Sequence, residues 1–166
     1  MDHKRLEKYN CNLIPLSSHS TKPIFYRQDD PSILVKEFSD LASMKKEHDI
    51  HVKAQSLVPS PTIIDCFTEH SKGYILMTRI SGDTIYNIYG QEPTDVPKSI
   101  WNQIHSIIYK LYYNNIHYID ITPFNFIVDS KGSVHIIDFG DAYTNKVNWF
   151  LKDFLDGENV WNPDFE

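Results

Sequence analysis

The chain has 166 residues, of which 41% are hydrophobic, and this is enough to bury a substantial core. Its formal net charge of −6 argues against nucleic acid as the main ligand, and no apolar run reaches the roughly 20 residues of a membrane span. Cys11 and Cys66 show no metal or redox spacing, which favours free thiols in a reducing compartment. The charged N-terminus precedes no apolar segment, so we expect an intracellular, cytoplasmic protein without a secretory signal or a membrane partner.

The first half of the sequence predicts a small antiparallel sheet with one helix. Strands are expected at 12–16 and 23–27, and Ser32–Phe38 is a β-rich run that contains one lysine. Residues 40–57 form the predicted helix, and a buried strand over 73–82 leads into a linker. The loose apolar face of the helix consists of Leu41, Met44, Ile50, Val52, Ala54 and Leu57.

The lysine in the β-rich run, Lys36, needs an explanation because a charge in an apolar strand is costly unless it is paired. Two carboxylates of the following helix are candidate partners, of which Glu47 lies eleven residues further on and about two turns into the helix. Asp49 is the alternative partner, but it falls about 200° away around the helix. An edge-strand lysine that extends into solvent remains the other explanation. His48 and His51 have no third candidate ligand nearby and are expected on the surface rather than at a metal.

The second half predicts helices around one β-hairpin. Thr94 or Asp95 is the expected N-cap of a long helix. A short helix over 147–155 is expected to stop at Gly157, and the tail with Trp161 and Phe165 is expected to fold back. The apolar face of the long helix consists of Ile100, Trp101, Ile104, Ile107, Ile108, Leu111 and Tyr112.

The run Asp120-Ile-Thr-Pro-Phe-Asn125, followed by Asp138-Phe-Gly140, carries the strongest chemical signal. It places a carboxylate, an amide and a second carboxylate at intervals of five and thirteen residues. Residues 126–137 are expected to form a hairpin, which returns its two ends to one edge, so the three side chains should converge. Phosphoryl transfer uses such a set: one Asp orients the attacking hydroxyl, while an Asn and an Asp hold Mg²⁺. The alternative is that Asp120 and Asn125 only cap turns.

Both spacings match the catalytic loop and the DFG motif of protein kinases, and the passage resembles the catalytic core of that superfamily. The resemblance covers about residues 10–143. It implies an α+β class: a minimal bilobal protein-kinase-like fold with a small antiparallel N-lobe sheet plus one helix and a truncated helical C-lobe. Residues 1–166 would then be a single domain, with the N-lobe at about 10–79 and the C-lobe at 83–166.

Only 141–166 follow the DFG motif, and in this the chain looks like the RIO kinases and the small atypical kinase of the KEOPS complex. We therefore expect the peptide-docking platform of ordinary kinases to be absent. At the family's His-Arg-Asp position the chain reads Tyr118-Ile119-Asp120, so activation through an arginine contact to a phosphorylated loop is not expected. The abundance of Ile, Asn, Lys and Tyr is typical of AT-rich genomes, such as those of large DNA viruses or protists.

The resemblance also implies roles for single residues. Lys36, held by Glu47, would orient the α- and β-phosphates of ATP, and Asp120 would position the acceptor hydroxyl as the catalytic base. Asn125 and Asp138 would bind Mg²⁺ or Mn²⁺. The acceptor itself, an unidentified protein or small molecule with a hydroxyl group, is not named by the sequence.

The adenine and phosphate contacts are assigned by register. Met77 takes the gatekeeper position, and the backbone C=O of Thr78 and N–H of Ile80 would contact the adenine. The phosphate-covering loop falls on Leu16–Thr21, which contains no glycine, so φ > 0 is costly there and weak nucleotide binding is expected. The candidate ATP contacts in this loop are Ser18 and Ser20.

Three functions remain open from the sequence. The first is a Mg-ATP-dependent atypical serine/threonine protein kinase. The second is a small-molecule kinase or a partner-regulated ATPase, and the third is a nucleotide-binding pseudokinase that acts as a scaffold. The glycine-free loop favours the scaffold, whereas the presence of all four core polar residues argues against it, because an inactive site has no physical need for them.

Overall fold

The computed structural model describes residues 13–15, 22–145 and 148–165, with the side chains of 13–15 left out. The chain divides into two compact units, which are described separately here. Unit 1 comprises Met1–Val52 and Pro61–Arg79, and unit 2 comprises Lys53–Ser60 and Ile80–Glu166. The structure confirms the predicted α+β class, and the assignment of 1–166 to a single domain stays a prediction. Among the described residues, no helix is both long and apolar enough to cross a bilayer.

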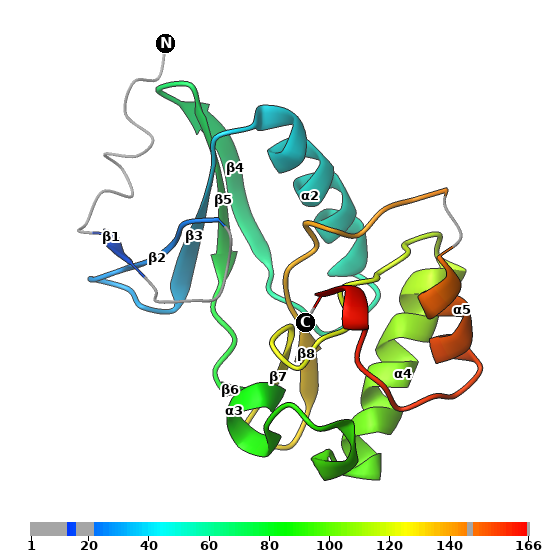
Figure 1. Ribbon diagram of the computed structural model, residues 1–166. Helices are drawn as coiled ribbons and strands as arrows, with labels where there is room; N and C mark the ends of the chain where they lie inside the picture. Colours follow the sequence, from blue (N-terminus) through cyan, green and yellow to red (C-terminus); the bar gives the residue numbers. More distant parts are fainter. Residues whose placement is uncertain (1–12, 16–21, 146–147, 166) are drawn as a thin grey trace. The chain divides into compact units, whose positions relative to one another are not determined.

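Unit 1 is an antiparallel five-stranded sheet in the order β1-β2-β3-β5-β4 (Figure 1). Side chains alternate across the strands, so β3 and β5 each contribute to two apolar clusters on opposite faces. One cluster includes Val35 and Tyr74, and the other includes Phe38 and Met44, the latter from helix α2. The elements are β1 Leu13–Pro15, β2 Ile24–Arg27, β3 Ile33–Phe38, α2 Leu41–Ala54, β4 Ile63–Glu69 and β5 Lys72–Thr78.

Helix α2 begins at Leu41 because Asp40 caps it. The carboxylate of Asp40 accepts from the N–H groups of Ala42 at 3.2 Å and Ser43 at 3.0 Å. The predicted apolar face of this helix is partly wrong, since Leu41 and Val52 are 42% and 39% exposed. The residues that α2 buries are Met44, Glu47, Ile50, His51 and Ala54.

The buried face of α2 thus contains two polar side chains, which weaken the apolar periodicity of the sequence. One of them corrects the expectation that His51 lies on the surface. His51 is buried, and its Nε2 donates to the carbonyl of Pro61 at 2.8 Å. This bond ties α2 to the chain that leads into β4, so a buried polar group is satisfied.

Unit 2 contains a second antiparallel sheet, β6-β7-β8, with helices beside it (Figure 1). A Cβ on Gly82 would lie 2.3 Å from the carbonyl oxygen of Val128, so only glycine permits the approach of the linker to β7. The elements are β6 Asp83–Thr84, α3 Ile85–Tyr89, η1 Pro93–Asp95, α4 Lys98–Tyr113, β7 Phe126–Val128, β8 Val134–Ile136, α5 Trp149–Leu155 and η2 Pro163–Phe165.

The predicted N-cap of the long helix α4 is wrong. Thr94 and Asp95 lie in the 3₁₀ turn η1, and α4 starts at Lys98 with Pro97 in the cap position. Val96 precedes a proline and is extended, with φ −83° and ψ 124°, so the helix cannot run through it. The buried face of α4 agrees with the prediction except at Tyr112, which is 37% exposed.

The tail folds back within unit 2, as predicted. Trp161 is buried, with its ring centroid 4.4 Å from that of Trp101 on α4 and 6.5 Å from that of Phe126 on β7. Asn148 caps α5, and Gly157 follows that helix with φ 109°, in the left-handed region that favours glycine.

Candidate functional site

Lys36 and Glu47 form a buried ion pair within unit 1. Lys36 Nζ lies 2.6 Å from Glu47 Oε1, and the two residues are 3% and 1% exposed. β3 lies between β2 and β5, so Lys36 is not an edge-strand lysine. Asp49, the alternative partner, is exposed and pairs with Lys45 at 2.6 Å. The geometry therefore selects Glu47, whereas the role of the pair in phosphate binding stays a prediction.

A buried ion pair is weak evidence for stabilisation. Removing two charges from water costs about as much as their attraction returns, and apolar replacements are often neutral or stabilising. This pair lies between the sheet and helix α2, on the side where Phe38 and Met44 form an apolar cluster.

Asp120, Asn125 and Asp138 come together within unit 2, as the hairpin predicted. β7 and β8 pair with Phe126 opposite Ile136, and beyond them the N–H of Ile137 donates to the carbonyl of Asn125 at 2.9 Å. Asn125 and Asp138 therefore lie at the open end of the hairpin. Asn125 Nδ2 also donates to the backbone carbonyl of Asp120 at 3.1 Å. The structure brings these three residues together, and their chemical roles stay predictions.

The electrostatics of this cluster are unusual at Asp120. Burial, the largest cause, together with the charges of Asp138 and Asp141, raises the pKa of Asp120 to about 6. Hydrogen bonds from the side chains of Asn125 and Thr122 act in the opposite direction and lower this pKa. Asp120 is thus ionised at neutral pH yet more basic than an exposed aspartate.

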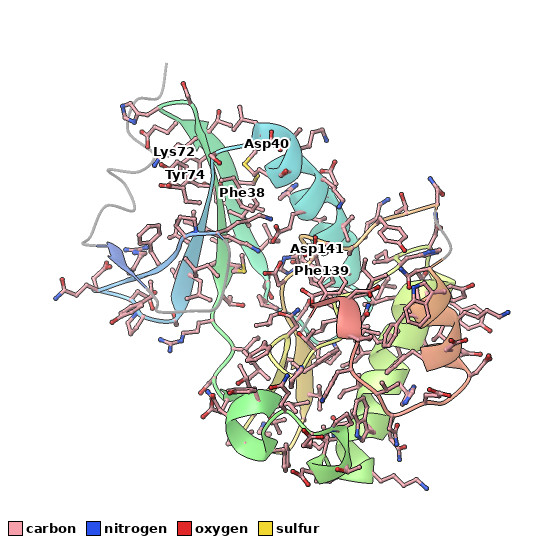
Figure 2. All side chains as sticks on the ribbon, in the orientation of Figure 1. Phe38, Asp40, Lys72, Tyr74, Phe139 and Asp141 are labelled. Carbon is pink, nitrogen blue, oxygen red and sulfur yellow. The ribbon has the colours of Figure 1, made fainter. Side chains whose placement is uncertain are left out.

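Asp138 has a special backbone conformation, with φ 59° in the left-handed region. Aspartate tolerates this conformation better than most residues, and Asp138 Oδ1 accepts from the N–H of Gly140 at 3.0 Å. The next residue, Phe139, is fully buried and packs edge-on against Tyr118, with centroids 5.7 Å apart. Figure 2 labels Phe139 and Asp141 in this segment. The Phe139 anchor and the Gly140 bond together hold the Asp138 carboxylate in place.

Two residues that position this cluster were not singled out for this role from the sequence. Tyr118 is buried, and its hydroxyl donates to the carbonyl of Ile137 at 2.8 Å. This bond joins the segment that precedes Asp120 to the segment that precedes Asp138. The sequence signal for this role was the position of Tyr118 two residues before Asp120. Asn162 is fully buried and donates from Nδ2 to the carbonyl of Ile119 at 2.7 Å.

The backbone N–H of Asn162 also donates to the carbonyl of Ile121 at 2.9 Å. The tail therefore holds the main chain on both sides of Asp120. No sequence signal pointed to Asn162, because it lies 42 residues after Asp120 and matches no motif.

The donor set of Asn125 and Asp138 fits a hard divalent cation, which prefers carboxylate and amide oxygens. Nδ2 of Asn125 is engaged by the Asp120 backbone, so Oδ1 is the atom that would face a cation. No group of three or more His, Cys, Asp or Glu side chains in the described part of the chain is arranged to hold a metal. A magnesium ion here would complete its shell with phosphate and water oxygens, as Mg²⁺ usually does.

The structure describes three of the five remaining residues with a predicted nucleotide contact. Ser18 and Ser20 lie outside the described residues. Met77 is buried in the cluster with Phe38 and Ile75. Thr78 ends β5, and its Oγ1 accepts from the N–H of Thr62 at 2.9 Å, while Ile80 follows outside the strand. The adenine contacts of these residues stay predictions.

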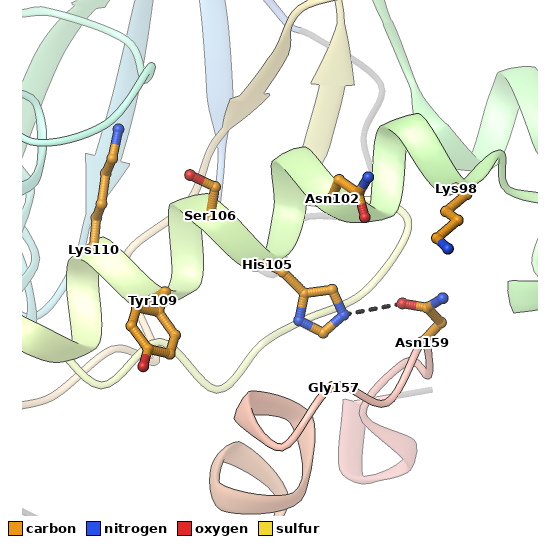
Figure 3. A pocket seen from close by; sticks show the side chains of 8 residues that line it. All are labelled: Lys98, Asn102, His105, Ser106, Tyr109, Lys110, Gly157 and Asn159. Carbon is orange, nitrogen blue, oxygen red and sulfur yellow. Dashed lines mark hydrogen bonds between the residues drawn. The ribbon is translucent and has the colours of Figure 1, made fainter.

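A groove of about 640 Å³ lies elsewhere in unit 2, on the surface of α4 (Figure 3). His105 Nε2 and Asn159 Oδ1 share a hydrogen bond of 3.0 Å across it. None of the predicted site residues lines this groove. Its lining consists of Lys98, Asn102, His105, Ser106, Tyr109, Lys110, Gly157 and Asn159.

Comparison with known proteins decides the family. The sequence model of the protein kinase domain family matches residues 20–155, which is most of the chain. The chain belongs to the protein kinase family. Kinases of this family in general use ATP and a divalent metal ion.

A curated relative supports the resemblance to the small kinase of the KEOPS complex. It is the EKC/KEOPS complex subunit BUD32 of Enterocytozoon bieneusi (strain H348), which is 35% identical over 115 residues. The match covers 61% of this chain and 54% of the relative, so the chain spans about half the length of that protein. A crystal structure of WbdD has a TM-score of 0.62 with this chain at 16% identity, covering 84% of this chain and 35% of WbdD. This second likeness concerns the fold alone.

Proposed function

We propose that the chain is an atypical kinase that transfers a phosphoryl group from Mg-ATP to a serine or threonine hydroxyl of a protein. The observation that carries this proposal is the cluster of Asp120, Asn125 and Asp138 at the open end of one hairpin, with the pKa of Asp120 raised to about 6. A base with a pKa near the working pH combines ionisation with proton affinity, which is what general-base catalysis needs.

Each residue has a distinct part in the proposed reaction. Asp120 accepts the proton of the attacking hydroxyl, a contribution of about 10²–10⁴ in rate. Asn125 Oδ1 and the Asp138 carboxylate would hold the metal ion, which would neutralise charge on the transferred group. In unit 1, the Lys36 ammonium group, held by Glu47, binds phosphate oxygens of the nucleotide.

A partner-regulated ATPase is the second candidate. The curated relative is named as a subunit of the EKC/KEOPS complex, which favours a chain that works with protein partners. The same residues would then act on water instead of a hydroxyl group. A catalytically inactive scaffold is less favoured, because a half-buried Asp120 with a raised pKa beside Asp138 lowers the stability of the fold at neutral pH without a use.

Incubation with γ-labelled ATP and Mg²⁺ distinguishes these functions. Label on the protein or on an added folded partner supports the kinase, and free phosphate without protein label supports the ATPase. The control is Asp153→Asn, which removes an exposed carboxylate from α5 and should leave the activity unchanged. Absence of both products at high enzyme concentration, with ATP bound, would support the scaffold and overturn the kinase.

The metal site is tested by thermal unfolding with ATP. Mg²⁺ should increase the stabilisation by ATP in the wild-type protein, because a ligand of the folded state raises the melting temperature. Asp138→Asn should abolish this increase while keeping the fold, since asparagine also tolerates φ 59°. An equal effect of Mg²⁺ on both proteins would contradict the assignment of Asp138.

A further inference from the structure

Glu47 contacts a second lysine in addition to Lys36. Lys22 Nζ lies 3.0 Å from Glu47 Oε2, while Lys36 Nζ lies 2.6 Å from Oε1. Both ammonium groups also lie over the ring of Phe38, at 4.9 Å and 5.8 Å from its centroid. The Lys22 side chain is 28% exposed, so this cluster of two lysines and one glutamate is buried on one side and reaches solvent on the other.

The strand register explains why Lys22 reaches this position. The N–H of Glu37 donates to the carbonyl of Pro23 at 2.9 Å, so the β2–β3 pairing extends to the residue that precedes β2. The preceding residue, Lys22, then falls opposite Phe38. Because side chains alternate across a strand, Lys22, Lys36 and Phe38 share the face that α2 covers.

The composition of this cluster is unlike that of a simple structural ion pair. One carboxylate suffices to neutralise Lys36, and a second cation on the same carboxylate gives the three groups a net charge of +1. Each ammonium group has three N–H donors, so a contact with Glu47 does not exclude a contact with another oxyanion. Asp40, which caps helix α2, also feels the charge of Lys22, but it is exposed and its lowered pKa is due chiefly to hydrogen bonds from Ser43.

We propose that Lys22 is a second phosphate-binding residue, which with Lys36 forms a two-ammonium site for the oxyanions of the nucleotide. This proposal rests on the proposed nucleotide binding and deepens it. The ammonium groups of Lys22 and Lys36 would here replace the donors that a glycine-rich loop supplies, since the segment 16–21 contains no glycine. Phosphate oxygens are the fitting ligand, because lysine binds them as a point charge without a fixed geometry.

The experiment measures the dissociation constants of ATP, adenosine and inorganic tripolyphosphate by calorimetry with Mg²⁺ present. Lys22→Met should weaken the binding of ATP and tripolyphosphate roughly tenfold, the value of one partly exposed charge-assisted contact. Adenosine should bind as it does to the wild type, and Lys22→Arg should restore most of the ATP affinity. The matched control is Lys72→Met, which removes a lysine paired with Glu37 at 2.7 Å in the same unit.

The outcomes separate this inference from the proposed function. Equal ATP affinity of the wild type and Lys22→Met, or an equal loss for ATP and adenosine, overturns the role of Lys22 as a phosphate ligand and leaves nucleotide binding intact. Tripolyphosphate binding that depends on Lys22, without ATP binding, supports the anion site and overturns the kinase. A wild-type protein that binds none of these ligands overturns both.

Discussion

The two charged clusters of this molecule are built in opposite ways. In unit 1, opposite charges meet on regular elements: Lys36 on β3 and Glu47 on α2 pair at 2.6 Å, and Lys22 joins them at 3.0 Å. In unit 2, like charges meet on loops: Asp138 and Asp141 act on Asp120 and raise its pKa. The first cluster joins opposite charges and keeps a surplus of one positive charge among its three groups, whereas in the second the charges of Asp138 and Asp141 oppose the ionisation of Asp120.

This difference predicts opposite responses to mutation. Removing Glu47 leaves Lys36 buried without its carboxylate, which destabilises the fold. Removing the charge of Asp120 relieves the desolvation and repulsion that raise its pKa, so we expect a more stable fold and a loss of the proposed activity. Sites that store such strain are where stability and activity oppose each other.

The largest expected effect is on the rate. Asp120→Asn should lower phosphoryl transfer by about 10²–10⁴, because the amide cannot accept the hydroxyl proton. ATP affinity should remain close to that of the wild type, since in the proposed reaction Asp120 acts on the acceptor and not on the nucleotide. Single-turnover transfer of label and calorimetry on the same samples give the two values. A variant that loses ATP binding and rate to the same degree would place Asp120 at the nucleotide instead.

The next effect is on the stability of unit 1. Glu47→Ala should lower the free energy of unfolding by about 3–5 kcal/mol, because two lysines then lose their common partner. Lys36→Met should cost less, since Glu47 keeps its contact with Lys22. Urea unfolding measures both, and Glu37→Ala, which breaks the more exposed pair with Lys72, should cost under about 1 kcal/mol. An equal cost for Glu47→Ala and Lys36→Met would show that Lys22 does not compensate.

A smaller effect concerns the tail that holds the catalytic loop. Asn162→Ala removes the Nδ2 bond to the Ile119 carbonyl and should cost about 1–3 kcal/mol. The rate should fall more than the ATP affinity, because the backbone beside Asp120 loses a support. Asn159→Ala, in the same tail but exposed and bonded only through its side chain to His105, is the control. If the fully folded Asn162→Ala variant transfers phosphate at the wild-type rate, the role of Asn162 is purely structural.

The smallest effect is the pH dependence of stability. The folded state raises the pKa of Asp120 from 3.8 to about 6, so it favours the protonated carboxyl. The resulting penalty is absent below about pH 4, grows as the pH rises to about 6 and is constant above. Asp120→Asn should therefore stabilise the protein at pH 8 by about 1 kcal/mol, after allowance for partial solvent exposure, and not at pH 4. Urea unfolding at both values checks this, and an equal difference at the two values would exclude the titration of Asp120 as its cause.

Local patterns were sufficient for most of the elements and for the pairing of charges. The resemblance to protein kinases predicted the contact of Lys36 with Glu47, and the strand-turn-strand pattern after Asn125 predicted that Asp138 returns to it. The second prediction succeeds because the two strands of a hairpin run side by side, so the residues at its open end meet. The same reasoning failed at α4, where a proline overrode the capping residues Thr94 and Asp95.

The amino-acid sequence by itself determined the family, the α+β class and the polar residues that match the kinase motifs. Only the tertiary structure decided which further side chains contact or support them: Lys22 beside Glu47, His51 against Pro61, and Asn162 against the backbone of Ile119 and Ile121. These contacts join residues that are far apart in the chain or outside any periodic pattern. They depend on strand register and on how the C-terminal tail with Trp161 packs, and a short stretch of sequence predicts neither.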